Sequence, residues 1–216
     1  CWSSEAPTGN AIDPGVGVCL ERTAETLKAL GYDVREEGLG IDYRALYRAQ
    51  GLVSAANLAA GIKRWVEIKG REPAGDIEGL ARRAYEAGKK ISGADALWGW
   101  QQLRLMNRQI LARFEGWDVH LTPVMCTPAP RVDYLDTLME DLKEFDRRQS
   151  ATFGFTPPSN FTGQPSLSLP LWQSESGLPI AMMLPAQYAD EATLFRLAGQ
   201  LEKELPWAGR RPGVWE

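Results

Sequence analysis

The chain has few of the residues that build metal sites and hydrolytic triads. Its 216 residues include one histidine, His120, and three cysteines, Cys1, Cys19 and Cys126, with no Cys-x-x-Cys spacing. This argues against a disulfide framework and against a zinc site. A serine or cysteine nucleophile would need activation by His120, by a lysine or by a group from elsewhere. We expect no metal and no organic cofactor.

The sequence also lacks long apolar runs and a strong net charge. No apolar stretch approaches the roughly 18 residues of a membrane helix, and no signal-peptide pattern opens the chain. A net charge of -4 and a pI near 5.3 give no electrostatic reason to expect nucleic acid. With 44% hydrophobic residues the chain can bury a sizeable core. We expect a soluble cytoplasmic protein that binds neither nucleic acid nor membranes.

The first part of the chain predicts a helix followed by a strand. Asp13 is a favourable N-cap, Pro14 suits the first helical position, and Gly31 suits the left-handed position that closes a helix. Residues 32–36 then alternate as a short strand. Such a unit implies a preceding strand, and because only the first few residues could supply it, we expect a chain that continues a longer sheet.

Periodicity predicts mostly helices in the middle of the chain. Predicted helices cover residues 42–69, 77–92, 94–115 and 136–148. Gly51 and Gly61 are unfavourable inside the helix over 42–69. One face of the helix over 94–115 mixes core and polar positions, which indicates an amphipathic boundary or the lining of a wet cavity; it contains Leu97, Gln101, Arg104, Leu105, Arg108 and Leu111.

The last third predicts a small sheet and a closing helix. Residues 119–121 are predicted as a strand that Pro123 ends, because proline cannot donate a ladder hydrogen bond. The run "SLSLPL" (166–171) is predicted to pair with "LPIAMML" (178–184) through the turn "QSESG". A final helix is predicted to begin near Asp190.

Four segments of this region resemble the amidase signature family. They are "DVHLTPVMCTPAP" (118–130), "NFTGQPSLSLPL" (160–171), "SGLPIAMMLPAQYADEATLFRLAGQLE" (176–202) and "LPWAGRRP" (205–212). The opening "IDPGVGVCLERTAETLKALGYDV" (12–34) is similar to the segment that follows the catalytic part in that family. Within the family the tail looks most like bacterial amidases of the 6-aminohexanoate cyclic-dimer hydrolase type.

The resemblance implies an α/β fold in which helices flank a mixed β-sheet, and hydrolysis of carboxamide C–N bonds by a Ser-Ser-Lys mechanism. The Gly/Ser-rich signature that carries those residues is not found here, and Ser3-Ser4 lacks its glycine context. We therefore expect residues 1–216 to be the C-terminal portion of a single amidase-type domain, with no catalytic residue of its own and with the N-terminal catalytic portion missing. The isolated chain is expected to be inactive.

The family architecture implies that the loop over 153–161 helps to wall the substrate pocket. The candidate pocket residues are Cys126, Phe155, Pro158, Asn160 and Phe161. Prolines fix the path of this loop and its aromatic residues offer apolar contact area. Four of the candidates have a structural alternative: the two phenylalanines as core residues, Asn160 with Thr162 and Gly163 as a corner, and Cys126 as a buried inert thiol. His120 is interpreted as a hydrogen-bonded structural histidine.

Other functions stay open at this stage. One is a non-catalytic interaction protein that uses the tryptophans at positions 98, 100, 172, 207 and 215. An amidotransferase subunit shares the family pattern, and a hydrolase with Cys1 as an N-terminal nucleophile is a third alternative. For an amidase, the expected partners are a small-molecule amide and either the missing N-terminal half or a second copy, because a half-domain exposes apolar surface.

Overall fold

The computed structural model describes residues 1–211, and the chain divides into two compact units. The first unit contains residues 1–40, 110–130 and the chain from 151 onward, and the second contains 41–109 and 131–150. That the chain is part of one amidase-type domain stays a prediction. Within the described residues no helix is long and apolar enough to cross a bilayer. The cytoplasmic location also stays a prediction.

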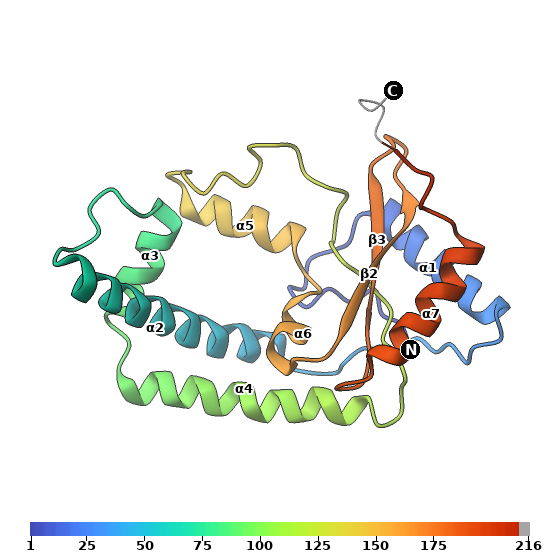
Figure 1. Ribbon diagram of the computed structural model, residues 1–216, viewed down its shortest axis with the longest axis horizontal. Helices are drawn as coiled ribbons and strands as arrows, with labels where there is room; N and C mark the ends of the chain where they lie inside the picture. Colours follow the sequence, from blue (N-terminus) through green and yellow to red (C-terminus); the bar gives the residue numbers. More distant parts are fainter. Residues whose placement is uncertain (212–216) are drawn as a thin grey trace. The chain divides into compact units, whose positions relative to one another are not determined.

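A three-stranded antiparallel sheet is the centre of the first unit (Figure 1). Its strands are β1 (Thr122–Pro123), β2 (Ser166–Gln173) and β3 (Pro179–Pro185), in the order β1-β3-β2. In the register of β2 and β3, Leu169 lies opposite Met182. The Ser174 amide donates to the Leu178 carbonyl at 2.8 Å in the connecting turn. The predicted hairpin is therefore confirmed.

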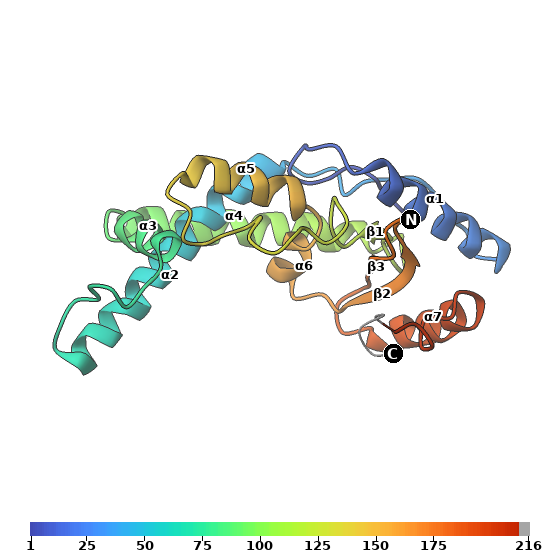
Figure 2. The ribbon, with the colours of Figure 1, turned by 90° about the horizontal axis from the view of Figure 1, so that it is seen from above.

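Two helices cover one face of this sheet, α1 (Pro14–Ala29) and α7 (Glu191–Glu204) (Figures 1 and 2). Each begins at a predicted cap: Asp13 accepts hydrogen bonds from two first-turn amides of α1, and Asp190 accepts one from the Thr193 amide of α7. Alternate residues of β3 point to these helices, as the pleat of a strand requires. The resulting core contains Leu20, Leu121, Leu171, Met182, Leu184 and Leu201.

Two predicted strands of the first unit differ from the structure. Residues 32–36 form no strand and make one isolated parallel bridge, between Trp2 and Glu36. The strand predicted over 119–121 is instead Thr122–Pro123, while Val119 and Leu121 form single bridges. Pro123 is compatible with β1 because β1 is an outer strand of the three. The sequence predicted a mixed sheet. Among the described residues, the named strands pair antiparallel, and the parallel pairings are the single bridges of Trp2 with Glu36 and with Leu121.

The second unit is built from helices. They are α2 (Tyr43–Lys69), α3 (Gly79–Gly88), most of α4 (Gly93–Arg113) and most of α5 (Leu142–Thr152). Helix α2 confirms the helix predicted over 42–69 and is unbroken at Gly51 and Gly61; it ends at Gly70, whose φ is +68°. Two glycines bring neighbouring helices close to α2: a Cβ on Gly88 would lie 2.7 Å from the Ala55 carbonyl carbon, and one on Gly99 would lie 3.1 Å from the Ala49 oxygen.

The core positions predicted at Leu97 and Leu105 of α4 were wrong. Leu97 is 65% exposed and Leu105 47% exposed, whereas Leu103 and Ile110 are buried. The buried face is centred near Gly99, since the missing side chain allows contact with the α2 backbone there. The helix predicted over 136–148 begins later, at Leu142, because Asp141 accepts hydrogen bonds from the amides of Lys143 and Glu144.

Candidate functional site

Two of the five candidate pocket residues meet in a small buried cluster. Cys126 and Phe155 pack with Ala6 and Met183, and Cys126 is fully buried. The Cys126 amide donates to the Thr152 carbonyl at 2.9 Å, and its carbonyl accepts from the Asp13 amide at 2.7 Å. Burial raises the pKa of the Cys126 thiol, because the thiolate loses hydration. Burial therefore favours the protonated, neutral thiol, and the two backbone hydrogen bonds fix the position of Cys126.

Gly154 allows the backbone before Phe155 to approach this cluster. A Cβ at position 154 would lie 2.5 Å from the Cys126 sulfur and 3.4 Å from the Ala6 Cβ. The distance to the sulfur is shorter than van der Waals contact, whereas the distance to Ala6 is an ordinary contact, so a larger residue would have to displace the thiol. The sequence identified Cys126 and Phe155 as candidates but gave no signal that Gly154 joins them.

The predicted loop over 153–161 contains a short helix, α6 (Pro157–Thr162). Pro158 is buried, Phe161 is half-buried and Asn160 is exposed. The helix ends at Gly163, with φ at +70°, as the sequence predicted for this corner. The Thr162 hydroxyl donates to the Pro158 carbonyl at 3.1 Å, which supports the structural interpretation of Thr162. A pocket role for Asn160 and its neighbours stays a prediction.

His120 lies in an aromatic cluster of the first unit. Its ring stacks on Trp117 with centroids 5.5 Å apart and meets the edge of Phe114 at 6.5 Å. Burial lowers the pKa of His120 to about 4, and a hydrogen bond with the Glu37 backbone opposes this shift. Within the described residues, Nε2 is buried without a hydrogen-bond partner. The expected hydrogen-bonded histidine is thus only partly satisfied, and its neutral form is strongly favoured.

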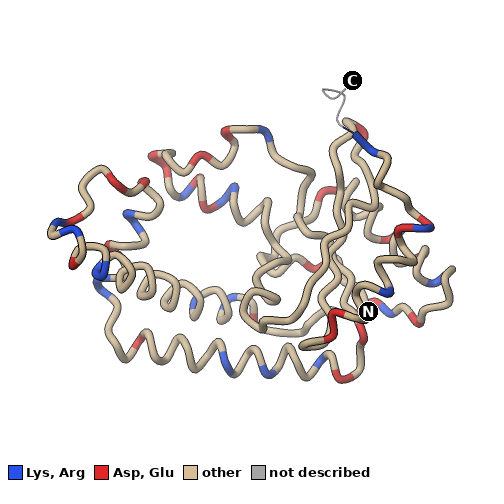
Figure 3. The backbone as a smooth tube through the Cα atoms, viewed as in Figure 1, with Lys and Arg blue, Asp and Glu red and all other residues tan. Residues whose placement is uncertain are grey.

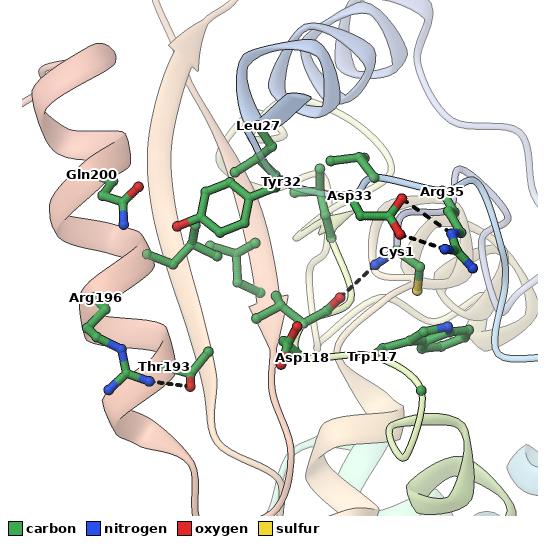
Figure 4. Close-up of a pocket in the computed structure, with 16 residues that line it drawn as sticks. Cys1, Leu27, Tyr32, Asp33, Arg35, Trp117, Asp118, Thr193, Arg196 and Gln200 are labelled. Carbon is green, nitrogen blue, oxygen red and sulfur yellow. Dashed lines mark hydrogen bonds and ion pairs between the residues drawn. The ribbon is translucent and has the colours of Figure 1, made fainter. Parts of the chain in front are cut away.

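A cavity of about 430 Å³ lies in the first unit (Figure 4). It is bounded by α1, α7, strand β3 and the segment 116–121. Leu27, Leu184 and Leu197 are among its apolar walls. Its polar groups include an ion pair in which Arg35 and Asp33 approach to 2.6 Å, and Arg196, which donates to the Thr193 hydroxyl at 2.8 Å. The volume is within the range of small-molecule pockets. This arrangement can hold an amphipathic group.

Sequence reasoning missed this cavity because its walls come from separate segments of the chain. The lining residues lie between positions 1 and 35, between 116 and 121, at 184, and between 193 and 200. None of the five candidate pocket residues is among them. No cluster of metal-ligating side chains occurs in the part of the chain that the structure describes.

Comparison with known proteins defines the class. A family model described as Amidase matches residues 5–195, so the chain belongs to the amidase family. The 6-aminohexanoate-cyclic-dimer hydrolase of Paenarthrobacter ureafaciens is 30% identical over 95% of this chain and 44% of its own length. A putative amidase of Mycobacterium tuberculosis is 42% identical over 50% of this chain and 22% of its own length.

Solved structures agree with the family assignment. A structure of 6-aminohexanoate cyclic dimer hydrolase matches all of this chain and 46% of its own with a TM-score of 0.86 and 26% identity. A bacterial aryl acylamidase of the amidase signature family matches 98% of the chain with a TM-score of 0.71 and 19% identity, which shows the common fold. The predicted family and fold class are confirmed. The chain spans less than half the length of these relatives.

Proposed function

We propose that this chain is part of an amidase that hydrolyses carboxamide C–N bonds. The observation that carries the proposal is the family match over residues 5–195. The 95% coverage of this chain in its alignment with a cyclic-dimer hydrolase supports it. Linear and cyclic amides are both compatible with this class of reaction.

The proposal assigns catalysis to residues outside these 216. A serine hydroxyl needs a base to take its proton, and a lysine can do so only when its surroundings keep it neutral. Backbone amides must also stabilise the oxyanion that forms when the serine attacks the carbonyl carbon. We assign this nucleophile, a second serine and the lysine base to the remaining part of the protein, because relatives of this chain are more than twice as long as the part that aligns.

In this proposal the chain completes the amidase fold and forms part of the wall of the substrate pocket. Cys126 and Phe155 are held rigidly in one cluster, and Pro158 is buried in the helix that follows. A neutral thiol and an aromatic ring suit the apolar part of an amide substrate, since neither has to be stripped of a charged hydration shell. Asn160 and Phe161 continue this wall in the proposal. These residues shape the pocket and take no part in proton transfer.

A direct test compares two proteins from the same gene. The full-length product and the 216-residue chain are assayed with the cyclic dimer of 6-aminohexanoate and with a linear carboxamide, and release of amine is measured. We expect hydrolysis by the longer protein and none by the shorter one, because the nucleophile and the base are lacking there. Hydrolysis by a homogeneous 216-residue preparation would contradict the assignment of catalysis, and an inactive longer protein would contradict the amidase proposal.

The two buried cysteines provide a test of the pocket wall in the active longer protein. Cys126→Ala is expected to change KM several-fold with a smaller effect on kcat, because it loosens the packing that holds Phe155 in the proposed pocket wall and leaves the nucleophile intact. Cys19→Ala is the matched control: Cys19 is also a buried thiol whose pKa is raised by burial, but it packs in the core beneath α1. Equal effects of the two variants on KM would remove Cys126 from the pocket.

A further inference from the structure

The helical unit has an exposed face that is both apolar and basic. From residue 96 to residue 114, the sequence of α4 and its end contains no aspartate or glutamate. Four large apolar side chains are exposed there: Leu97 (65%), Trp98 (43%), Trp100 (49%) and Leu105 (47%). Arg104 and Arg108 are exposed on the same helix, and Figure 3 shows the basic positions along α4. Several large apolar side chains exposed on one helix beside arginines are a composition that suits an interaction site.

A groove beside this face adds two further guanidinium groups. The groove has a volume of about 410 Å³ and lies between α2 and α4. Its lining includes Arg44 and Arg48 of α2 and Trp98 and Met106 of α4. The Arg48 guanidinium lies 5.8 Å from the centroid of the Trp98 ring. We call the groove and the exposed face of α4 together the basic aromatic surface.

The basic groups of the groove are not neutralised within the unit. Asp42 is the one carboxylate among the lining residues, and it accepts a hydrogen bond from the Ala45 amide at 3.0 Å as the N-cap of α2. Among residues 1–211, neither Arg44 nor Arg48 forms an ion pair. Arginine beside an exposed aromatic ring is a common composition at the centre of protein interfaces. The surface therefore fits a partner that offers carboxylates and an apolar side chain.

The same chain presents a segment of that chemistry, residues 132–141, which precedes α5. The segment "VDYLDTLMED" contains four acidic residues and no basic one. Val132 is 90% exposed and Leu138 is 68% exposed. The Leu138 amide donates to the Asp136 carboxylate at 2.9 Å and the Met139 amide donates to the Asp136 carbonyl at 3.1 Å. This turn holds Leu138 in solvent between acidic neighbours, and Figure 3 shows the acidic positions.

We propose that the basic aromatic surface binds the segment 132–141 of a second copy of this chain. Opposite charges face each other in such a contact, and Leu138 enters the groove beside Trp98. A two-fold arrangement forms the contact twice, so each copy contributes one surface and one segment. Two exposed charged contacts of this kind steer association and depend on salt, while the apolar contacts hold the complex. The proposal does not depend on the amidase activity.

The test measures self-association of the full-length product by sedimentation velocity over a range of concentrations. We expect a dimer whose dissociation constant rises several-fold between about 50 mM and about 500 mM sodium chloride. Arg44→Glu/Arg48→Glu is expected to weaken it roughly tenfold or more, since attraction becomes repulsion at both contacts. Acidic residues near a helix N-terminus are favourable, so α2 should stay folded. Arg64→Glu, an exposed reversal elsewhere on α2, is the control and should leave the dimer unchanged.

A charge swap makes the test specific for the segment. Glu140→Lys alone is expected to weaken the dimer, and Arg48→Glu/Glu140→Lys in one chain is expected to recover at least part of the affinity. A monomer at every concentration overturns the proposal, as does a dimer indifferent to the Arg44→Glu/Arg48→Glu change. Binding to phosphatidylserine vesicles that needs Arg44 and Arg48, with no dimer, would assign the surface to a membrane and would also overturn it.

Discussion

Gly88→Ala is expected to destabilise the helical unit by about 3 kcal/mol or more. The added Cβ would overlap the Ala55 carbonyl and would lie 2.9 Å from the Ala59 Cβ, so α3 and α2 would have to separate. Backbone atoms of α2 cannot move aside as a flexible side chain would, and the separation would expose packed surface of both helices. Urea unfolding followed by far-ultraviolet circular dichroism measures the change in the free energy of unfolding.

Gly61→Ala is the matched control for this substitution. Gly61 is also helical, but no heavy atom lies within 4 Å of a Cβ built on it. Alanine should therefore stabilise α2 by up to about 1 kcal/mol, because it restricts the unfolded chain and favours the helix. If the two variants unfold at the same urea concentration, the close approach of α3 to α2 at Gly88 is wrong.

Acidification is expected to destabilise the first unit, which contains the sheet, through His120. The pKa of His120 is about 4 in the folded protein, below the usual value of 6.5. The unfolded chain therefore binds a proton below about pH 6.5 while the folded protein does not, so stability is complete above that pH and falls as the pH drops toward 4. Between about pH 7 and about pH 5 this one group should lower the free energy of unfolding by about 2 kcal/mol.

His120→Phe separates this effect from the titration of carboxylates. Phenylalanine can keep the contacts with Trp117 and Phe114 but has no nitrogen to protonate. The variant loses the hydrogen bond with the Glu37 backbone and is expected to be less stable at neutral pH, yet its stability should change less between pH 6.5 and pH 4. Urea midpoints measured across this range give both slopes. If the urea midpoints of the two proteins fall equally with pH, protonation of His120 does not lower the free energy of unfolding.

The sequence was most informative where local chemistry decides the structure. Asp13, Gly31 and Asp190 mark helix ends by capping or by backbone conformation, and the β2–β3 hairpin follows from alternation on both sides of a short turn. These features depend on neighbours in the sequence. They could be predicted without knowing the rest of the fold.

Predictions failed where contacts between distant segments decide the structure. Leu97 and Leu105 have helical spacing typical of a core face, but Gly99 places the opposite side of α4 against α2. Residues 32–36 have strand-like alternation but pair only at Glu36. The candidate site shows both cases: Phe155 was proposed from the family resemblance and Cys126 from its place in the loop after a predicted strand, while the cavity and Gly154 depend on segments that meet only in three dimensions.

The division of the chain has a consequence for its synthesis on the ribosome. The helical unit is enclosed in the sequence by the segments of the sheet unit, and the chain passes between the units near residues 40, 109, 130 and 150. Contacts between α2 and α3 are local, so they can form as soon as residue 88 has emerged. Strand β1 must wait for β3, about 60 residues later in the chain. We expect the helices to fold during translation and Leu121, Met182 and their neighbours to stay exposed until the hairpin is complete.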